Sequence, residues 1–501
     1  MKQANAVPDR AATLVVHPTP GIGDATTIED AVAMIETMGG GEIFLREGAY
    51  APAATIDLPD LPISIKWVAN AVVITSPSGL PLFSVAAAFT SRYSFSGFSV
   101  TGDNSIGNAL INLDSDVDVS FHEVHTSAVR DIVVTSTTPE VSFSFCSFSM
   151  TAANNWSFWR GSATGGALIW DYVDVTVGAT QSTTGIVGDP EWTVTASYVG
   201  GGGPLTSSLN LGKTTIQGFR ADKLRFILGS PGNRIVNLEL TDGNISIDND
   251  RTLIANSIFL TPTLSGTQVS VRGAGGGAGL VEHTISGCVF DSTGVTGTNF
   301  QIEVSEVQGL EIVGCSFNNN GTGAGTDANI GVGDTGGDTQ LTVVGCKFTG
   351  GNPAQAVLEF FPLGTISARY DDNLGFETAD IRSPNSTVNG MKRFDVTGGA
   401  TTNAPVTQFT HTNTRGLVGV GTIKNTGANS MDVIETAIDA FGVTSSTTTT
   451  VLAGNDLLLE EQVNIGTARP PYRSYSVAVQ STVAGNPTTF DLQFASQGAD
   501  A

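Results

Sequence analysis

One short strand pattern occurs three times in the second half of this 501-residue chain, and it constrains the fold more than any other feature. Each copy has β-branched residues, then Gly-Cys, one further residue, Phe and a run of turn-forming residues. The copies are HTISGCVFDST at 283–293, LEIVGCSFNNN at 310–320 and LTVVGCKFTGG at 341–351. A strand that recurs at intervals of about 20 to 50 residues is the signature of a solenoid.

Related strands extend the repeat toward the N-terminus. VSFSFCSFSM at 141–150 carries a fourth cysteine, Cys146. Further copies of the strand are predicted to place other residues at the cysteine position: Phe98, His122, Leu238 and Asn256. The strands are short and are separated by Gly, Asn and Ser turns, with almost no helical periodicity. This pattern favours a parallel β-helix over helical repeats.

Equivalent residues of successive turns of a β-helix lie about 4.8 Å apart, the ordinary distance between paired strands. We therefore expect Cys288, Cys315 and Cys346 to form one inward column, with Phe290, Phe317 and Phe348 as a second column two residues further on. Disulfides and a metal site are the alternatives. The chain has no C-x-x-C pair, and free cysteine is among the most buried residue types, so we predict buried free thiols.

The composition limits the class of protein. Hydrophobic residues make up 40% of the chain and charged residues 14%, and glycine is frequent, which is typical of an ordered all-β protein. The formal net charge of −24 and the lack of a Lys/Arg cluster exclude a nucleic-acid partner. No apolar run approaches the ~18 residues that span a bilayer, so we expect no membrane insertion. The first 20 residues have no signal-peptide pattern, so work outside the cell needs another delivery route.

Residues 21–50 predict a short helix followed by a strand. Thr26 or Thr27 is the expected N-cap, and Gly39 begins a run of three glycines that ends the helix. The apolar residues between them have the spacing of one helix face: Ile28, Ala31, Val32 and Ile35. Such a helix covers the open end of the first coil, whose unpaired edge otherwise invites aggregation.

This segment resembles the N-terminal cap of the pectin-lyase-like superfamily. The pattern D-A-T-x-I-x-D-A, followed by G-G-G-x-I-x-L-x-x-G-x-Y, is matched by Asp24, Ala25, Thr26, Ile28, Asp30, Ala31, Gly39, Gly40, Gly41, Ile43, Leu45, Gly48 and Tyr50. Within the superfamily the chain looks most like bacteriophage tailspike and tail-fibre proteins. The resemblance implies a right-handed parallel β-helix that assembles as a homotrimer, and it specifies no activity.

The predicted organisation has five parts. These are an N-terminal virion-attachment segment at 1–20, the cap at 21–50, the parallel β-helix at 51–375, a connector at 376–406 and a C-terminal antiparallel β-sandwich at 407–501. The last part has longer strands with cleaner alternation than the coil. Residues 432–441 fit either a short helix or a strand. The resemblance implies that this domain promotes trimerisation or binds carbohydrate.

Four of the five tryptophans fall within 156–192, and this cluster is the candidate glycan site. Aromatic faces stack on the apolar faces of sugar rings, and charged side chains bond the sugar hydroxyls. The predicted glycan-binding residues are Trp156, Trp159, Arg160, Trp170, Tyr172 and Trp192. The alternative is that these rings pack into a core of their own.

Glycoside hydrolysis needs two carboxylates, about 5 Å apart for retention or about 6.5–9.5 Å apart for inversion. The candidates for this catalytic role are Asp171, Asp174 and Glu191, which lie in the same aromatic-rich segment. Solvated acidic loops are the alternative. No G-x-S-x-G motif is present, and His122 and His125 lack the i, i+4 spacing of a zinc protease. We expect no metal and no cofactor.

The sequence therefore predicts a phage tailspike or tail-fibre virion protein that binds a bacterial surface polysaccharide during adsorption. The expected partners are two further copies of the chain, the bacterial surface glycan, and a phage tail or adaptor protein at the N-terminus. Assembly in the host cytoplasm and release by lysis fit the missing signal peptide. Two alternatives stay open: a polysaccharide depolymerase on the same fold, and a purely structural fibre of the head or tail.

Overall fold

The computed structural model is built from short strands in a repeating three-strand order. It describes residues 12–66, 72–150, 157–178, 184–201, 207–261, 266–273, 280–293, 300–318, 328–333, 338–350, 356–359, 366–375, 387–388, 391–412, 419–460, 465–468, 470 and 472–497. The chain divides into two compact units, Met1–Leu260 and Thr261–Ala501. The structure is an all-β, right-handed parallel β-solenoid with a C-terminal antiparallel region, which confirms the predicted fold class.

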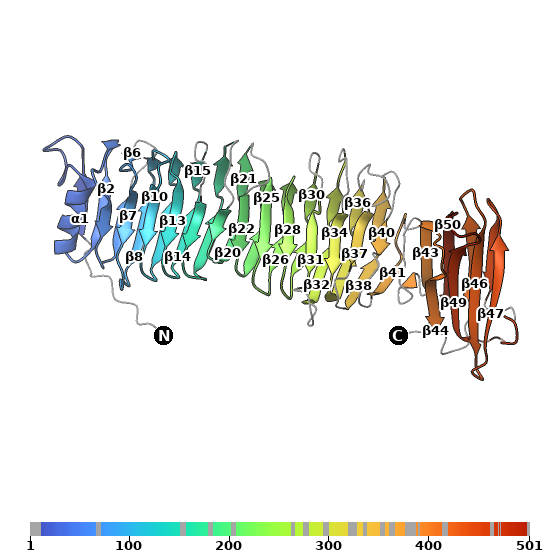
Figure 1. Ribbon diagram of the computed structural model, residues 1–501. Coiled ribbons are helices and arrows are strands. Elements are labelled where there is room, and N and C mark those ends of the chain that lie inside the picture. The colour runs from blue at the N-terminus through green and yellow to red at the C-terminus, as the bar shows by residue number, and fades with distance from the viewer. Residues whose placement is uncertain are drawn as a thin grey trace. The chain divides into compact units, whose positions relative to one another are not determined.

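In the first unit each turn of the solenoid contributes one strand to each of three parallel sheets (Figure 1). Sheet A contains β1 (Ala12–Val16), β2 (Gly41–Leu45), β5 (Ile63–Lys66), β8 (Arg92–Ser96), β11 (Asp118–His122), β14 (Glu140–Ser144), β17 (Ala167–Asp171), β20 (Glu191–Thr195), β23 (Thr214–Gln217), β26 (Arg234–Val236) and β29 (Leu253–Ala255). Sheet B contains β3 (Gly48–Tyr50), β6 (Val72–Thr75), β9 (Ser99–Thr101), β12 (His125–Ser127), β15 (Ser147–Met150), β18 (Asp174–Val177), β21 (Tyr198–Gly201), β24 (Arg220–Asp222), β27 (Glu239–Thr241) and β30 (Ile258–Leu260). Sheet C contains β4 (Ile56–Leu58), β7 (Pro81–Val85), β10 (Ala109–Leu113), β13 (Asp131–Thr135), β16 (Ser157–Gly161), β19 (Thr184–Val187), β22 (Ser207–Leu211), β25 (Leu224–Leu228) and β28 (Asn244–Ile247).

Helix α1 (Ile28–Thr37) lies at the N-terminal end of these sheets (Figure 1). The Thr27 hydroxyl accepts a hydrogen bond from the backbone N–H of Asp30 at 3.1 Å, which confirms the predicted N-cap. All four predicted apolar residues of the helix are buried. Gly39, with φ of +84°, follows the helix in a left-handed conformation that glycine adopts at little cost. The described part of the expected attachment segment forms β1, which pairs in parallel with β2.

The second unit repeats the three-strand turn and then changes to antiparallel sheets. Its parallel strands are β31 (Val269–Arg272), β32 (Leu280–Ser286), β33 (Val289–Asp291), β34 (Phe300–Ser305), β35 (Val307–Val313), β36 (Ser316–Asn318), β37 (Ala328–Gly333), β38 (Thr339–Val344), β39 (Lys347–Thr349), β40 (Val357–Glu359) and β41 (Ile366–Asp371). The remaining strands are β42 (Thr387–Val388), β43 (Met391–Ala400), β44 (Val406–Thr412), β45 (Gly419–Asn425), β46 (Met431–Asp439), β47 (Thr444–Val451), β48 (Asp456–Glu460), β49 (Tyr472–Ser481) and β50 (Thr489–Gln497).

The antiparallel strands form two sheets over one core. Strands β43, β50, β45 and β48 pair in that order, and β44, β49, β46 and β47 form the other sheet. Apolar residues of both sheets, among them Phe394, Phe409 and Ile423, belong to one buried cluster. Residues 431–439 are strand β46, so the strand alternative for the 432–441 segment is the one that the structure adopts.

The predicted columns are present in the second unit. Cys288, Cys315 and Cys346 are buried free thiols, and the backbone N–H of Cys315 lies 3.4 Å from the Cys346 sulfur. The rings of Phe290, Phe317 and Phe348 stack with centroid separations of 5.0 and 4.8 Å. Hydrogen bonding with the neighbouring Cys288 thiol raises the pKa of Cys315 to about 12. The thiols are therefore packing groups of the coil interior.

The first unit corrects the predicted repeat alignment at two places. Phe121 pairs with Phe143 and His122 with Ser144, so Val124 takes the cysteine position where the sequence predicted His122. Ala255 pairs with Val236, so Ser257 lies opposite Leu238 and Asn256 one residue before it. Both errors come from ignoring the corner residue between the strands.

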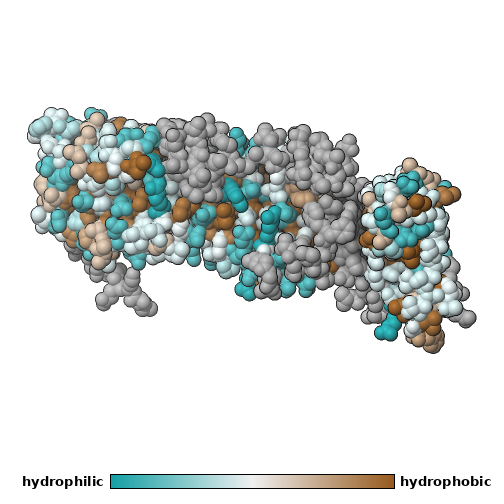
Figure 2. All heavy atoms as spheres, viewed as in Figure 1, coloured by the Kyte–Doolittle hydropathy of each residue, from teal (hydrophilic) through white to brown (hydrophobic). Residues whose placement is uncertain are grey.

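That corner joins sheet A to sheet B, and it is a single residue in the left-handed backbone conformation. The corner residues of successive turns are Gly97, Glu123, Phe145, Tyr172, Ala196, Gly218, Asn237 and Asn256. From Gly97 to Asn237, the backbone N–H of each corner residue donates to a carbonyl of the following turn, as from Phe145 to Asp171 at 3.0 Å. The corner residues therefore form an ordered row along the outside of the unit. On the face shown in Figure 2, hydrophobic and hydrophilic residues are interspersed over the described surface.

Candidate functional site

Two exposed aromatic residues occupy this corner row. Phe145 and Tyr172 have φ of 53° each, are 50% and 53% exposed, and their rings stack with centroids 5.1 Å apart and planes 5° apart. The His122 ring meets the ring of Phe145 edge-on at 5.6 Å. A left-handed backbone costs a residue with a side chain about 1–2 kcal/mol, and other turns place Gly97 or Gly218 here. The chain thus holds two large apolar rings in solvent at a position where glycine is easier.

Polar side chains lie on both sides of these rings. On sheet A, Ser144, Asp171 and Thr195 pair across successive turns, and they point outward just before the corner. On sheet B the first outward positions are Ser147, Asp174 and Tyr198. The carboxylates of Asp171 and Asp174 therefore stand on either side of Tyr172 along the chain. We name this surface the aromatic corner; it comprises Ser144, Phe145, Ser147, Asp171, Tyr172, Asp174, Thr195 and Tyr198.

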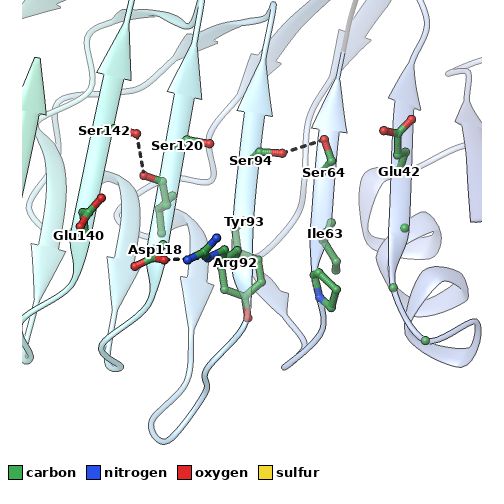
Figure 3. Close-up of a pocket in the computed structure, with 15 residues that line it drawn as sticks. Glu42, Ile63, Ser64, Arg92, Tyr93, Ser94, Asp118, Ser120, Glu140 and Ser142 are labelled. Atoms are coloured by element: carbon green, nitrogen blue, oxygen red, sulfur yellow. Dashed lines mark hydrogen bonds and ion pairs between the residues drawn. The ribbon is translucent and has the colours of Figure 1, made fainter. Parts of the chain in front are cut away.

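A groove of about 570 Å³ lies on the outward face of sheet A (Figure 3). Its lining includes a row of serines on neighbouring strands, Ser64, Ser94, Ser120 and Ser142, and Ser94 donates to Ser64 at 2.8 Å. Arg92 forms an ion pair with Asp118 at 2.8 Å, and Glu140 lies opposite Asp118 on the next strand. Small hydroxyls and charged groups of both signs give the groove several hydrogen-bonding positions for a polar ligand.

Strand β14 connects the groove with the aromatic corner. Its outward residues are Glu140, Ser142 and Ser144, and Phe145 follows directly. Glu140 and Ser142 line the groove, and Phe145 is one of the two stacked rings. Five residues of extended strand cover about 17 Å. An extended ligand that lies along β14 contacts both features.

Three of the predicted glycan-binding tryptophans lie in the interior of the coil. Trp159, Trp170 and Trp192 are 0%, 2% and 0% exposed. Trp170 and Trp192 meet edge-on at 5.1 Å, and both contact the ring of Phe219. In this structure Trp170 and Trp192 pack against other rings and Trp159 is fully buried, as in the core alternative. Trp156 lies outside the described residues.

Arg160 neutralises a buried acid on sheet C. Its guanidinium lies 2.9 Å from the Asp131 carboxylate, which is 1% exposed and also accepts a hydrogen bond from the Ser157 hydroxyl at 2.6 Å. Burial raises the pKa of Asp131, while Ser157 and Arg160 lower it. In this structure Arg160 therefore serves as the ion-pair partner of the buried Asp131 carboxylate.

The predicted catalytic carboxylates fall at two places. Asp171 and Asp174 flank Tyr172 at the aromatic corner, but Glu191 begins β20 opposite Ala167, whereas Asp171 lies opposite Thr195. Glu191 and Thr195 are the first and last residues of β20, four residues or about 13 Å apart along the strand, so Glu191 is distant from Asp171. Glu191 instead continues the row of Asp118 and Glu140, with Ala167 between.

The sequence prediction missed Phe145. The signal was present: the copies of the strand that are aligned on their cysteines place Gly287, Gly314 and Gly345 where the copy at 141–150 has Phe145. A phenylalanine where the three aligned copies have glycine indicates a backbone cost that a function other than stability explains. Among the described residues, no three His, Cys, Asp or Glu side chains are grouped so that they hold a metal ion. Nor is any described helix long and apolar enough to cross a membrane.

No family model matches the sequence, and no curated protein matches it. Solved structures similar to this chain include tailspike protein 3 of bacteriophage CBA120, at 13% identity and a TM-score of 0.39, over 74% of this chain and 57% of that one. The catalytic domain of a GH87 α-1,3-glucanase in complex with nigerose has 14% identity and a TM-score of 0.42, over 77% and 69% of the two chains. A tailspike protein of the E. coli bacteriophage HK620 in complex with a hexasaccharide has 10% identity and a TM-score of 0.35, over 94% and 89%.

The chain thus spans 57% of the length of the tailspike protein 3 chain. Likenesses of this degree concern the fold alone, and the strand pairing described above establishes that fold independently. The three neighbours named above are two phage tailspike proteins and a glucanase.

Proposed function

We propose that the chain is a tailspike-like virion protein that binds a bacterial surface polysaccharide, and that the aromatic corner is where it holds the sugar. The proposal rests on one observation: Phe145 and Tyr172 are stacked, half exposed and held in a backbone conformation that costs free energy. Stability alone favours glycine at these positions. A role in binding explains why the rings are kept.

The chemistry of the corner suits a saccharide. A sugar ring has an apolar face of C–H groups and an edge of hydroxyls. The exposed rings of Phe145 and Tyr172 match the first, and the carboxylates of Asp171 and Asp174 accept hydrogen bonds from the second. Ser144 and Thr195 add hydroxyls on the sheet A side. A few placed polar groups around apolar contacts are typical of ligand sites.

The assembly that we infer strengthens weak binding. As a homotrimer attached to a phage tail or adaptor protein, the chain presents three copies of the corner to one bacterial surface. Linked sites raise the overall affinity by orders of magnitude, roughly 10²–10⁴, when the geometry allows simultaneous contact. This arrangement suits attachment during adsorption.

Binding of purified bacterial surface polysaccharides to the full chain tests the proposal. We expect the double variant Phe145→Gly, Tyr172→Ala to lose at least about ten-fold in affinity, or about 1.4 kcal/mol. The matched control is Ile106→Ala, which removes another exposed apolar side chain of the same unit, 81% exposed. Equal affinities for all three proteins contradict the proposal. A complete absence of binding to any bacterial polysaccharide favours a structural fibre.

Hydrolysis of the polysaccharide is the second candidate function. It is favoured by the row of carboxylates on sheet A, where Asp118 and Glu140 lie on adjacent strands and Glu191 lies two strands beyond Glu140. Asp171 and Asp174 supply a second pair beside the rings. New reducing ends after incubation with the bound polysaccharide, lost in Glu140→Gln or in Asp171→Asn, identify a depolymerase and its site.

A further inference from the structure

We propose that the polysaccharide held at the aromatic corner is neutral or carries amino groups, and that polymers bearing uronate, sialate or phosphate are rejected. This inference rests on the proposed function, because it assigns a ligand class to the same site. It depends on the charges that surround the two rings on every strand packed beside them.

Among the charged side chains at the outward positions of the turns that carry the rings, carboxylates predominate. Over β11, β14, β17 and β20, the corner row and the sheet B strands that follow, the acidic residues are Asp118, Glu123, Glu140, Asp171, Asp174 and Glu191. Glu123 is the corner residue of the turn before Phe145, so it precedes the rings in the corner row. Asp171 and Asp174 lie on the two sides of Tyr172. An anionic sugar on the rings therefore meets carboxylates from three directions.

The basic residues around this surface are distant or already paired. Arg92, one turn earlier on sheet A, forms its ion pair with Asp118 at 2.8 Å. Lys213 lies just before β23 on the next turn, opposite Glu191. Arg220, after Tyr198 on sheet B, lies 3.3 Å from Glu239. None of these cations adjoins Asp171 or Asp174.

Two histidines complete the set of titratable groups. The Nδ1 atom of His122 lies 2.8 Å from the Ser144 hydroxyl, and that of His125 lies 2.7 Å from the Ser147 hydroxyl. These contacts direct the His122 imidazole toward Ser144 on sheet A and the His125 imidazole toward Ser147 on sheet B. Arg160, the nearest arginine in the sequence, is on sheet C and holds Asp131. The corner thus offers acceptors of hydrogen bonds and a negative field. The Arg220 guanidinium, 5.7 Å from the centre of the Tyr198 ring, is paired with Glu239, and the Nε2 atom of His122 lies 3.8 Å from the Glu123 carboxylate.

This pattern selects by ligand charge. A carboxylate accepts short hydrogen bonds from sugar hydroxyls and amides, and it attracts an ammonium group. The same carboxylate repels a uronate or phosphate, and over distances within about 10 Å this repulsion persists at 0.1 M salt. The net charge of −24 of the whole chain adds to the repulsion during approach.

An array of purified bacterial capsular and lipopolysaccharide glycans tests the inference, with neutral, amino-sugar and acidic polymers present together. Three proteins are compared at low and at physiological salt: the unchanged chain, the single variant Tyr172→Ala, and the double variant Asp171→Asn, Asp174→Asn. We expect every polymer whose binding depends on Tyr172 to be neutral or amino-bearing. We also expect the double asparagine variant to bind acidic polymers about ten-fold better than the unchanged chain, because two negative charges are removed.

The outcomes separate the inference from the function on which it rests. An acidic polymer that binds the unchanged chain and is lost in Tyr172→Ala overturns the inference and leaves the proposed function in place. An array in which no polymer depends on Tyr172 overturns the proposed function, and the inference with it. The control variant Ile106→Ala must retain every interaction of the unchanged chain.

Discussion

The ring of Phe145 lies on the ring of Tyr172, with centroids 5.1 Å apart, and both residues have the left-handed backbone of a corner that two other turns give to Gly97 and Gly218. The hydrogen bonds that the two backbone N–H groups donate to Asp171 and Thr195 fix this register. The stack is therefore a product of the solenoid itself: side chains at the same corner of successive turns are brought into contact. From this relationship we infer the glycan site and its ligand class.

The variant Phe145→Gly separates binding from stability. Glycine relieves a backbone cost of about 1–2 kcal/mol and loses about 0.5–1 kcal/mol through greater freedom of the unfolded chain. Loss of the ring contacts costs about a further 0.5–1.5 kcal/mol. We expect the free energy of unfolding to change by no more than about 1 kcal/mol and the polysaccharide affinity to fall at least ten-fold. Denaturant unfolding and a binding isotherm measure the two quantities. A well-folded variant with unchanged affinity removes Phe145 from the site.

Substitutions of Trp192 test whether the buried tryptophans have a role in binding. We expect Trp192→Ala to destabilise the chain by about 3–5 kcal/mol, because it leaves a cavity in the core. The indole N–H of Trp192 has no hydrogen-bond acceptor among the described residues. Trp192→Phe removes that donor, so its net cost is expected to be only about 1 kcal/mol, with polysaccharide binding unchanged. Loss of polysaccharide binding in a folded Trp192→Phe variant would show that Trp192 takes part in binding and would contradict this prediction.

The thiols are expected to be unreactive in the folded protein. Cys146, Cys288, Cys315 and Cys346 are buried, and burial raises the pKa of Cys146 to about 11. Because the thiolate is the reactive form, a thiol reagent at pH 8 should modify none of the four before unfolding and all four after it. Rapid modification of Cys315 in the native state contradicts the column of packed thiols.

Glu435 gives the C-terminal sheets a pH-dependent stability. Burial raises the pKa of Glu435, and the Tyr475 hydroxyl, which donates to its carboxylate at 2.6 Å, lowers it in part. Since the folded pKa lies above the unfolded value, the unfolded state releases the proton first, and stability falls as pH rises from the ordinary glutamate pKa through the folded one. We expect Glu435→Gln to remove this fall, so that the variant is more stable than the unchanged chain at neutral pH.

Thermal unfolding across that pH range measures the effect. Asp432→Asn, on the same strand β46, is the matched control, and the fall in stability assigned to Glu435 should persist in it. A profile of Glu435→Gln that also follows the unchanged chain shows that the glutamate titrates without affecting stability.

Most of the fold was predictable because its signals are local. The repeated strand with Cys and Phe two residues apart shows which side chains share a face, and stacking of turns follows from the repeat. The Thr27 cap and the apolar spacing from Ile28 to Ile35 likewise predict α1 without any distant contact. The copies around His122 and Asn256 were misaligned because their corner residues, Glu123 and Asn256, are not glycine.

The site was harder to predict, because residue type and position in the turn had to be considered together. Trp170 follows Ile169 in the strand ALIWD, and it pairs with Phe143, an inward residue of the previous turn. The tryptophans cluster along the sequence because they fill the interior of the coil in this region. Of the predicted residues that the structure describes, Asp171, Tyr172 and Asp174 come together on the outside, and Phe145, which stacks on Tyr172, precedes it by 27 residues in the sequence.

Protection from hydroxyl-radical oxidation, with and without a saturating bacterial polysaccharide, tests the central claim most directly. In the free chain we expect Phe145 and Tyr172 to be oxidised readily and Trp170 and Trp192 slowly, in line with their exposure. When the polysaccharide is bound, oxidation of Phe145 and Tyr172 should fall several-fold, while that of Ile106 and of Phe441, which is 92% exposed, is unchanged. Undiminished oxidation of both rings at saturation, with protection elsewhere on the chain, contradicts the account.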